Sequence, residues 1–364
     1  MQVKPEIERF AKIKVVGVGG AGGNVLNSMI DSHQIQGVEF LAINTDAQDL
    51  SVNKAPVKIP IGQEITHGLG AGSDPAVGKK AAEESIEILK SHLENSDMVF
   101  ITAGMGGGTG TGASPTIAKI SKDLGALTVG VVTKPFTFEG ALRMRNAEKG
   151  IAELKGQVDA LITIPNQRLL EVADENMPIL EAFKLSDSIL NQGVQGIADL
   201  IVMPGLINVD FADVKTIMKD AGTALMGIGI GTGDNRAEIA AHDAISSPLL
   251  EQSIQGAKGI LFNIIGGKDM TMREVDRAAN IIREIANEDA NIIFGTTVDE
   301  SLVGKIKITV IATGFESKQE DRGYNFIDKP EPTPQMPKDM HKPEDSSPQD
   351  LQSKYDIPAF LRGK

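Results

Sequence analysis

The 364-residue chain contains no cysteine and no tryptophan, and aromatic residues make up only 4% of it. Without thiols, the chain can form neither disulfide bonds nor thiolate metal sites. Its five histidines are scattered and no two have the spacing of metal ligands, so we expect no metal held by the chain's own side chains. Hydrophobic residues still make up 41% of the sequence, and the core that they form must be mainly aliphatic.

Long apolar segments are absent as well. No apolar run reaches the length of a membrane span, and the opening Met-Gln-Val-Lys-Pro-Glu lacks the apolar region of a secretory signal. The formal net charge of −13 disfavours general binding to nucleic acid or to anionic lipid. We therefore expect a cytoplasmic protein with no nucleic-acid partner and no direct membrane insertion.

Glycine, by contrast, is abundant, with 39 residues, and it gathers in loops that follow apolar runs. The longest loop, 103–115, reads Ala-Gly-Met-Gly-Gly-Gly-Thr-Gly-Thr-Gly-Ala-Ser-Pro and lies between the strand-like run 98–101 and the helix-compatible run 116–122. Glycine lets a backbone lie close against a ligand, and free amide groups ahead of a helix bind anions. The pattern predicts a phosphate-binding loop rather than a flexible linker, because hydrophobic patterns flank it directly.

A second glycine turn follows the strand predicted over 13–19. Gly17, Gly19 and Gly22 satisfy the G-x-G-x-x-G spacing, and Asp46 lies at roughly the distance of a ribose-binding acid. Alone, this fingerprint makes an NAD(P)-dependent oxidoreductase a competing hypothesis. Such an enzyme has no use for the second phosphate loop within 103–115, and we interpret the earlier turn as a first phosphate-binding turn.

A third glycine loop, 68–73, precedes Asp74 and Pro75. Aspartate is a common helix N-cap and proline is favoured at the first helical position, so we expect a helix from about 76 to 93.

Apolar strands recur at 39–44, 127–133 and 160–164, with helical patterns between them. This alternation predicts an α/β fold with a mostly parallel, Rossmann-like sheet. Ligands of such sheets bind beyond the carboxyl ends of the strands. The loops that should meet at that edge follow residues 18, 44, 70, 104, 133 and 164.

The pattern changes after a long central helix predicted from about 175 to 200. Further strands predict a second, smaller α/β domain, and they lie at 225–230, 259–265, 291–296 and 305–312. The next residues are rich in proline and charge and cannot bury enough apolar surface to fold, so we expect a disordered linker. Apolar residues return over 355–364, which predicts a short peptide presented to a partner's groove.

The motifs together resemble a known family. The run Gly-Gly-Gly-Thr-Gly-Thr-Gly at 106–112 is the tubulin-superfamily signature, and Asn-Val-Asp-Phe-Ala-Asp follows the central helix at 208–213. With the first glycine turn and the tail peptide, the chain resembles the FtsZ family of bacterial cell-division GTPases over 13–315 and its last nine residues.

The resemblance implies an enzyme that hydrolyses GTP to GDP, assembles head to tail into protofilaments and forms the division ring at mid-cell. It implies Mg²⁺ bound mainly through the nucleotide phosphates, and membrane-tethering and regulatory division proteins bound by the terminal peptide. The implied organisation is a GTP-binding domain (1–174), a central helix with a catalytic loop (175–220), a C-terminal α/β domain (221–315), a linker (316–355) and a partner-binding peptide (356–364).

The resemblance also assigns roles to individual residues. Those implied to bind the nucleotide are Gly20, Ala21, Gly22, Gly23, Asn24, Asn44, Ala71, Gly72, Gly104, Gly106, Gly107, Gly108, Thr109, Gly110, Glu139, Arg143, Asn166, Phe183 and Asp187. Those implied to act on the GTP of the next subunit are Asn208, Asp210 and Asp213. Those implied to bind partners are Ile357, Pro358, Phe360 and Leu361.

The residues by themselves leave simpler readings open. Phe183 alone would be a core residue and Asp187 a solvated charge. Asn208 or Asp210 could cap a helix over 211–219, with Asp213 in its first turn. A filament subunit that binds GTP without turnover is a third hypothesis beside the GTPase and the oxidoreductase.

Overall fold

The computed structural model describes residues 11–32, 35, 37–172, 177–203, 205–207, 209–247, 250 and 253–315. All of these lie in one compact unit, Met1–Ser317. The predicted linker 316–355, the predicted terminal peptide 356–364 and Asn208 lie outside the described residues.

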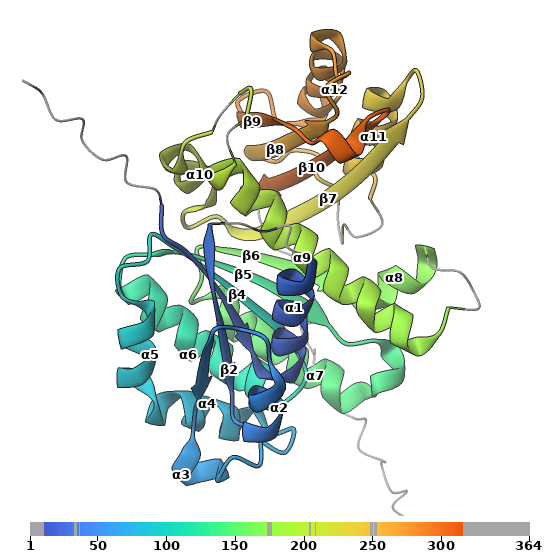
Figure 1. Cartoon of the computed structure of the whole chain (residues 1–364). Helices are drawn as coiled ribbons and strands as arrows, with labels where there is room; N and C mark the ends of the chain where they lie inside the picture. The colour runs from blue at the N-terminus through green and yellow to red at the C-terminus, as the bar shows by residue number, and fades with distance from the viewer. Residues whose placement is uncertain are drawn as a thin grey trace, which may run out of the picture. The chain divides into compact units, whose positions relative to one another are not determined.

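Strands and helices alternate through most of the described chain (Figure 1). The strands are β1 (Ile13–Val18), β2 (Val38–Asn44), β3 (Val57–Pro60), β4 (Met98–Gly104), β5 (Leu127–Lys134), β6 (Ala160–Pro165), β7 (Gly222–Thr232), β8 (Gly259–Gly266), β9 (Asn291–Val298) and β10 (Lys305–Thr313). The α-helices are α1 (Gly19–Ser32), α2 (Ala47–Val52), α3 (Gln63–Thr66), α4 (Pro75–Glu84), α5 (Ile86–Leu93), α6 (Thr109–Asp123), α7 (Ala141–Lys155), α8 (Asn166–Val172), α9 (Ile179–Val202), α10 (Phe211–Met218), α11 (Arg236–Ile245) and α12 (Met272–Ile285). The short 3-10 helices are η1 (Thr137–Glu139) and η2 (Glu300–Leu302).

The described strands form a ten-stranded sheet in the order β3-β2-β1-β4-β5-β6-β7-β10-β8-β9. The six strands β1 to β6 all pair in parallel. Strand β7 pairs in parallel with β6 at its first three residues. From Leu225 onward β7 pairs antiparallel with β10, which pairs antiparallel with β8. The predicted α/β fold with a mostly parallel sheet is confirmed, and β7 extends that sheet into the C-terminal part.

Both faces of the N-terminal part of the sheet are covered by helices, as its aliphatic strands require. Val15 belongs to a buried cluster with residues of α1 and α9, whereas Val16 and Val18 belong to a cluster with residues of α4 to α7. A third cluster joins β7, β8 and β10 to α11 and α12. Figure 1 shows α9 crossing between the N-terminal strands and the C-terminal part of the sheet.

Helix α6 begins at Thr109 and not near residue 116 as predicted, so half of the glycine loop is helical. The first turn closes with a hydrogen bond from the Gly112 amide to the Gly108 carbonyl oxygen. A Cβ atom on Gly112 would overlap the backbone oxygen of Pro75 in α4. The glycines therefore serve helix packing as well as ligand access, and this need overrides their low helix propensity.

Two other predicted helices differ in extent. The helix expected over 76–93 is divided at Ser85, whose hydroxyl accepts a hydrogen bond from the Gly62 amide, because serine competes with the helical hydrogen bonds. The central helix α9 begins at Ile179, immediately after Pro178, which disfavours helical backbone at the residue before it. The predicted N-cap Asp74 is confirmed, since its side chain accepts from the Ala76 amide.

Candidate functional site

A cavity of about 620 Å³ lies at the carboxyl edge of the parallel strands. It is built from the loops that follow β1, β2, β4, β5 and β6, together with the loop between α3 and α4 and one face of α9. This edge is the predicted one. Lining residues are Val18, Gly19, Gly20, Ala21, Asn44, Asp46, Asp49, Leu69, Gly70, Ala71, Gly72, Ser73, Gly104, Met105, Gly107, Gly108, Thr109, Gly110, Thr133, Pro135, Glu139, Arg143, Asn166, Phe183, Ser186, Asp187 and Leu190.

The N-terminus of α6 opens into this cavity. Gly108 precedes the helix and provides no side-chain cap, so the first amide groups of α6 are left without an intrahelical acceptor. The turn before it is held by a hydrogen bond of 2.8 Å from the Gly106 amide to the Thr111 hydroxyl. No acidic residue lies in the first turn, so the helix dipole and free amides favour an anion here.

The N-terminus of α1 faces the same space. Gly19 starts this helix with φ at 72°, a conformation that glycine adopts without strain, and a Cβ there would come within 2.9 Å of the Gly110 amide nitrogen. The two helix starts therefore lie side by side, and α1 also lacks an acid in its first turn. Two such starts at one cavity suit a ligand with several phosphate groups.

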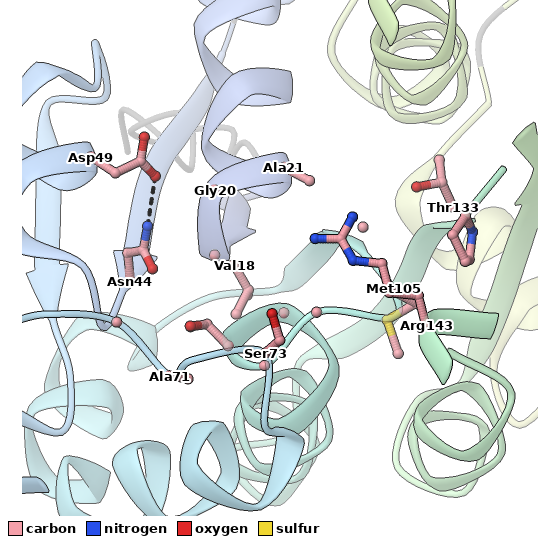
Figure 2. A pocket seen from close by; sticks show the side chains of 18 of the residues that line it. Val18, Gly20, Ala21, Asn44, Asp49, Ala71, Ser73, Met105, Thr133 and Arg143 are labelled. Carbon is pink, nitrogen blue, oxygen red and sulfur yellow. Dashed lines mark hydrogen bonds between the residues drawn. The ribbon is translucent and has the colours of Figure 1, made fainter. Parts of the chain in front are cut away.

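The end of β2 is held by side-chain hydrogen bonds. Asn44 donates from Nδ2 to Asp49 Oδ2 over 2.7 Å, as Figure 2 shows. The hydroxyls of Thr45 and Thr109 lie 2.6 Å apart and tie this loop to the start of α6. Asp46 Oδ1 accepts from the Gln48 and Asp49 amides as the N-cap of α2, so the acid expected for ribose in the oxidoreductase hypothesis serves to cap a helix.

Glu139 and Arg143 form the opposite wall. Glu139 accepts from the Phe136 amide through Oε1 at 2.9 Å and from Arg143 Nη1 through Oε2, so the guanidinium is fixed at the base of α7. In Figure 2 the Arg143 side chain reaches into the space between the loops. Of the described residues that line the cavity, Arg143 alone is basic.

The far end of the cavity combines an aromatic ring with a carboxylate. Phe183 and Asp187 lie one turn apart on α9, and the Phe183 ring packs edge-on against Phe136 with centroids 5.3 Å apart. Asn166 accepts from the Ser186 hydroxyl at 2.8 Å. Burial raises the pKa of Asp187 to about 6, so its carboxylate favours a ligand that donates hydrogen bonds to it.

Carboxylates outnumber cations around the cavity, with Asp46, Asp49, Glu139 and Asp187 against Arg143. Side-chain charge therefore does not neutralise a polyphosphate, and helix amides must carry most of its binding. No group of three His, Asp or Glu residues that could hold a metal occurs among the described residues.

Most of the predicted nucleotide-binding residues line the cavity, but four do not. Gly22 lies in α1 on its buried face, where a Cβ would meet the Thr102 carbonyl oxygen of β4 2.5 Å away. Gly23 is buried, Asn24 is exposed on α1, and Gly106 supports the turn through its bond to Thr111. Lining residues outside the predicted set include Asp49, Met105, Thr133, Pro135 and Ser186. Thr133 is recognisable as the end of a predicted strand, and Ser186 lies one turn from Phe183.

Asp210 and Asp213 lie elsewhere. Asp210 is the N-cap of α10 and its Oδ1 accepts from the Asp213 amide at 2.8 Å, as the capping interpretation predicts. Neither residue lines the cavity. Just beyond α10, the Asp220 and Gly222 amides bond to Asp159, at the amino end of β6. Helix α10 therefore lies toward the amino ends of the parallel strands, opposite the edge that carries the cavity, and Figure 1 shows α10 on that side of the strands.

A search of the described helices finds none with the length and apolar character needed to cross a membrane.

Comparisons with known proteins agree with this geometry. Residues 12–174 match the Tubulin/FtsZ family, GTPase domain, and residues 222–316 match the FtsZ family, C-terminal domain. An empty FtsZ dimer structure from M. jannaschii is 46% identical, covers 85% of this chain and 90% of that one, and has a TM-score of 0.81. A variant of the M. jannaschii protein is 47% identical with the same TM-score, over 85% of this chain and 92% of that one.

More distant structures share the fold. CetZ2 from Haloferax volcanii, in a GTPγS-bound protofilament, is 21% identical with a TM-score of 0.69 over 85% of this chain and 94% of that one. The oxidoreductase hypothesis is set aside, because the whole glycine-rich edge falls within the GTPase-domain match. The chain therefore belongs to the tubulin/FtsZ family of GTPases, with an FtsZ-family C-terminal domain after its GTPase domain.

Proposed function

We propose that this GTPase is a cytoskeletal protein that polymerises head to tail and forms the division ring, with each active site completed by the adjacent subunit. The observation that carries the proposal is the separation of the nucleotide cavity from Asp210 and Asp213. Within one subunit these acids lie toward the opposite edge of the sheet. A head-to-tail contact is the arrangement that brings one subunit's acids to another's nucleotide.

Exposed apolar side chains support this contact at both ends. Beside the cavity, Leu69 is 83% exposed and Leu142 is 65% exposed. Toward the other end, Leu206 is 74% exposed and its amide bonds to the Thr296 carbonyl of β9, while Met272 at the start of α12 is 75% exposed. A head-to-tail contact that repeats along a filament would cover these four side chains. The relatives' structures, a dimer and a protofilament, agree with self-association.

In the proposed complex, the amides of α1 and α6 bind the phosphates, while Ala71 and Gly72 approach the γ-phosphate. Gly104 and residues 106–110 form the phosphate cradle, Gly20 to Asn24 form the first turn, and Arg143 and Asn44 lie near the sugar and phosphates. Because carboxylates outnumber cations at the cavity, Mg²⁺ is needed to offset the phosphate charge. We expect the metal to be held by the phosphates themselves.

Asp187 is the proposed guanine-recognising residue. The guanine N1–H and N2–H₂ groups lie side by side and both donate to one carboxylate, whereas adenine lacks this pair of donors. Phe183 lies on the same helix face, where its ring covers the base. A partly buried carboxylate left without donors is costly, and this cost discriminates against adenine.

Asp210 and Asp213 are the proposed catalytic residues, together with Asn208. Phosphoryl transfer depends mainly on positioning and on charge stabilisation, so two carboxylates that orient the attacking water are sufficient. Turnover should then require assembly.

The terminal peptide 356–364 is the proposed binding site for membrane-tethering and regulatory division proteins, with Ile357, Pro358, Phe360 and Leu361 as its contacts. We propose the linker 316–355 as its tether, and we keep the predicted domain limits at 174, 220 and 315. A polymer that presents many tails gains avidity at a mid-cell membrane from weak individual contacts.

The testing experiment measures GTP hydrolysis per subunit against protein concentration, with Mg²⁺ and simultaneous light scattering. We expect turnover near zero at low concentration and a rise at the concentration where scattering begins. Constant turnover per subunit without polymer would show that each monomer hydrolyses alone and would remove the proposed roles of Asp210 and Asp213. Polymer without turnover would favour a purely structural filament.

A further inference from the structure

A cluster of charged side chains lies at the amino edge of the parallel strands, away from the cavity. Lys122 Nζ lies 3.1 Å from Asp159 Oδ1 and 2.8 Å from Asp220 Oδ1. The three residues come from the last turn of α6, the residue before β6, and the connection between α10 and β7. Distant parts of the sequence therefore meet at one ammonium group.

Asp159 is the fixed partner in this cluster. Its side chain is only 5% exposed, and Oδ2 accepts from the Thr128 amide at 2.9 Å. Its backbone carbonyl accepts from the Gly222 amide at 2.9 Å, at the start of β7. A buried carboxylate needs a counter-charge as well as hydrogen bonds, and Lys122 supplies it.

Asp220 is the exposed partner in this cluster, and its ion pair with Lys122 helps to hold its unusual backbone conformation. Its backbone has φ at 52°, in the left-handed region, and Gly222 follows with φ at 70°. The chain turns sharply here between α10 and β7. The hydrogen bond to Lys122 lowers the pKa of Asp220 and raises the pKa of Lys122, so both groups stay charged at neutral pH.

This turn fixes one end of α10, whose buried face packs into the core through Val214, Ile217 and Met218. Asp210 caps one end of α10 and Lys219 caps the other, directly before Asp220. The helix has eight residues, a length of about 12 Å at 1.5 Å per residue. A displacement at Asp220 would therefore tilt α10 about its packed face and shift the acids at its other end, because so short a helix moves as one body.

The opposite end of α6 forms the phosphate loop at Thr109. Lys122 thus links the segment that follows α10 to α6, the helix whose first residues line the nucleotide cavity. No residue of this charged cluster lines the cavity itself.

We propose that Lys122 is a positioning residue, which holds Asp220 against Asp159 and thereby places Asp210 and Asp213 for reaction on the neighbouring subunit's GTP. The inference rests on the proposed composite active site, and its experiments separate the two.

The main variant is Lys122→Met, which keeps the length of the side chain and removes its charge. We expect turnover per assembled subunit to fall about tenfold, as a small misplacement of catalytic groups does, with GTP affinity and half-saturating GTP unchanged. Lys122→Arg should restore most of the turnover, since a guanidinium also bridges two carboxylates. The matched control is Lys54→Met, which removes an exposed ion pair with Asp31 and should leave turnover unchanged.

A co-assembly experiment identifies which active site Lys122 serves. Lys122→Met subunits are mixed with Asp210→Asn subunits, whose cavity is intact. In the mixed polymer, some junctions pair the GTP of an Asp210→Asn subunit with the acids of a Lys122→Met subunit. If Lys122 supported only the cavity of its own subunit, both halves of these junctions would be intact, and turnover would recover. We expect no recovery, because both changes damage the acid-bearing face.

Recovery of turnover in the mixture, or unchanged turnover of pure Lys122→Met polymer, overturns the inference and leaves the composite site intact. If unmodified protein turns over GTP equally well without assembly, the composite site fails and the inference fails with it. If Lys122→Met does not fold because Asp159 loses its counter-charge, Asp220→Asn replaces it. Asparagine tolerates the left-handed backbone, and a smaller loss of turnover is expected.

Discussion

The two edges of the parallel sheet differ in the groups that they present, backbone at one edge and charged side chains at the other. The carboxyl edge is mostly backbone, with glycines and two helix N-termini around the cavity and Arg143 as its basic side chain among the described residues. The amino edge is mostly charged side chains, with Lys122, Asp159 and Asp220 in contact beyond α10. Backbone suits tight binding of phosphates, whereas side chains suit adjustable positioning. Changes at the first edge should affect folding and binding, and changes at the second should affect turnover.

The largest expected effect comes from Gly112→Ala at the carboxyl edge. Its Cβ would overlap the Pro75 backbone oxygen and crowd the Lys79 amide nitrogen, and backbone atoms of a helix cannot rotate away as a side chain can. We expect a loss of about 3 kcal/mol or more in the free energy of unfolding, measured by urea denaturation. Gly107→Ala is the control, because a Cβ there meets nothing within 4 Å. Equal stability of the two variants would contradict the packing role of Gly112.

At the opposite edge, Asp210→Asn tests catalysis apart from capping. Asparagine caps helices as well as aspartate does, so stability should change little. Loss of the charge should lower turnover per assembled subunit about 100-fold, with GTP binding and polymer mass retained. Normal turnover would show that Asp210 serves only as the N-cap of α10.

Within the cavity, backbone amides are proposed to bind the phosphates and the Asp187 side chain to bind the base. Asp187→Asn tests the side-chain part of this recognition. GTP affinity, measured by calorimetry, should fall about 10- to 100-fold through loss of hydrogen bonds to a charged acceptor. Preference for GTP over inosine triphosphate, which lacks the 2-amino group, should shrink. The nucleotide-free protein should melt higher at pH 7, since a raised carboxyl pKa means that burying the ionised form costs stability. A variant that binds GTP normally would remove Asp187 from base recognition.

The smallest effect concerns pH. Burial raises the pKa of Asp187 to about 6 in the free protein, and in the proposed complex guanine binds the ionised form. Affinity should be flat above pH 6 and weaken below it, by at most about tenfold per pH unit. The slope should be smaller in Asp187→Asn, where only the terminal phosphate of GTP still titrates, with a pKa of about 6. An equal slope in the two proteins would assign the titration to a group other than Asp187.

The sequence alone was sufficient to predict the alternation of strands and helices, the family and the loops that meet at the carboxyl edge. These features depend on local patterns: aliphatic runs, glycine turns, and the Asp74-Pro75 helix start. The start of α6 at Thr109 was predicted wrongly because it depends on Gly112 packing against α4, a contact between helices. Local patterns do not reveal such contacts.

The cluster around Lys122 was not predictable for the same reason. Lys122 and Asp220 are 98 positions apart, and nothing in either segment marks a partner for the other. Polar residues on separate loops become a site only through the fold. The family resemblance supplied Phe183 and Asp187, which their own spacing would have left as a core residue and a surface charge.

Strand β7 has a consequence for cooperativity. Its first three residues pair with β6 and the remainder with β10, so one unbroken ladder of backbone hydrogen bonds crosses from the GTPase part to the C-terminal part. If either part unfolded alone, β7 would lose hydrogen bonds on one side and backbone amide groups of the other part would be exposed. We expect the described body to melt in one calorimetric transition, with the amides of residues 222–224 exchanging only through global unfolding.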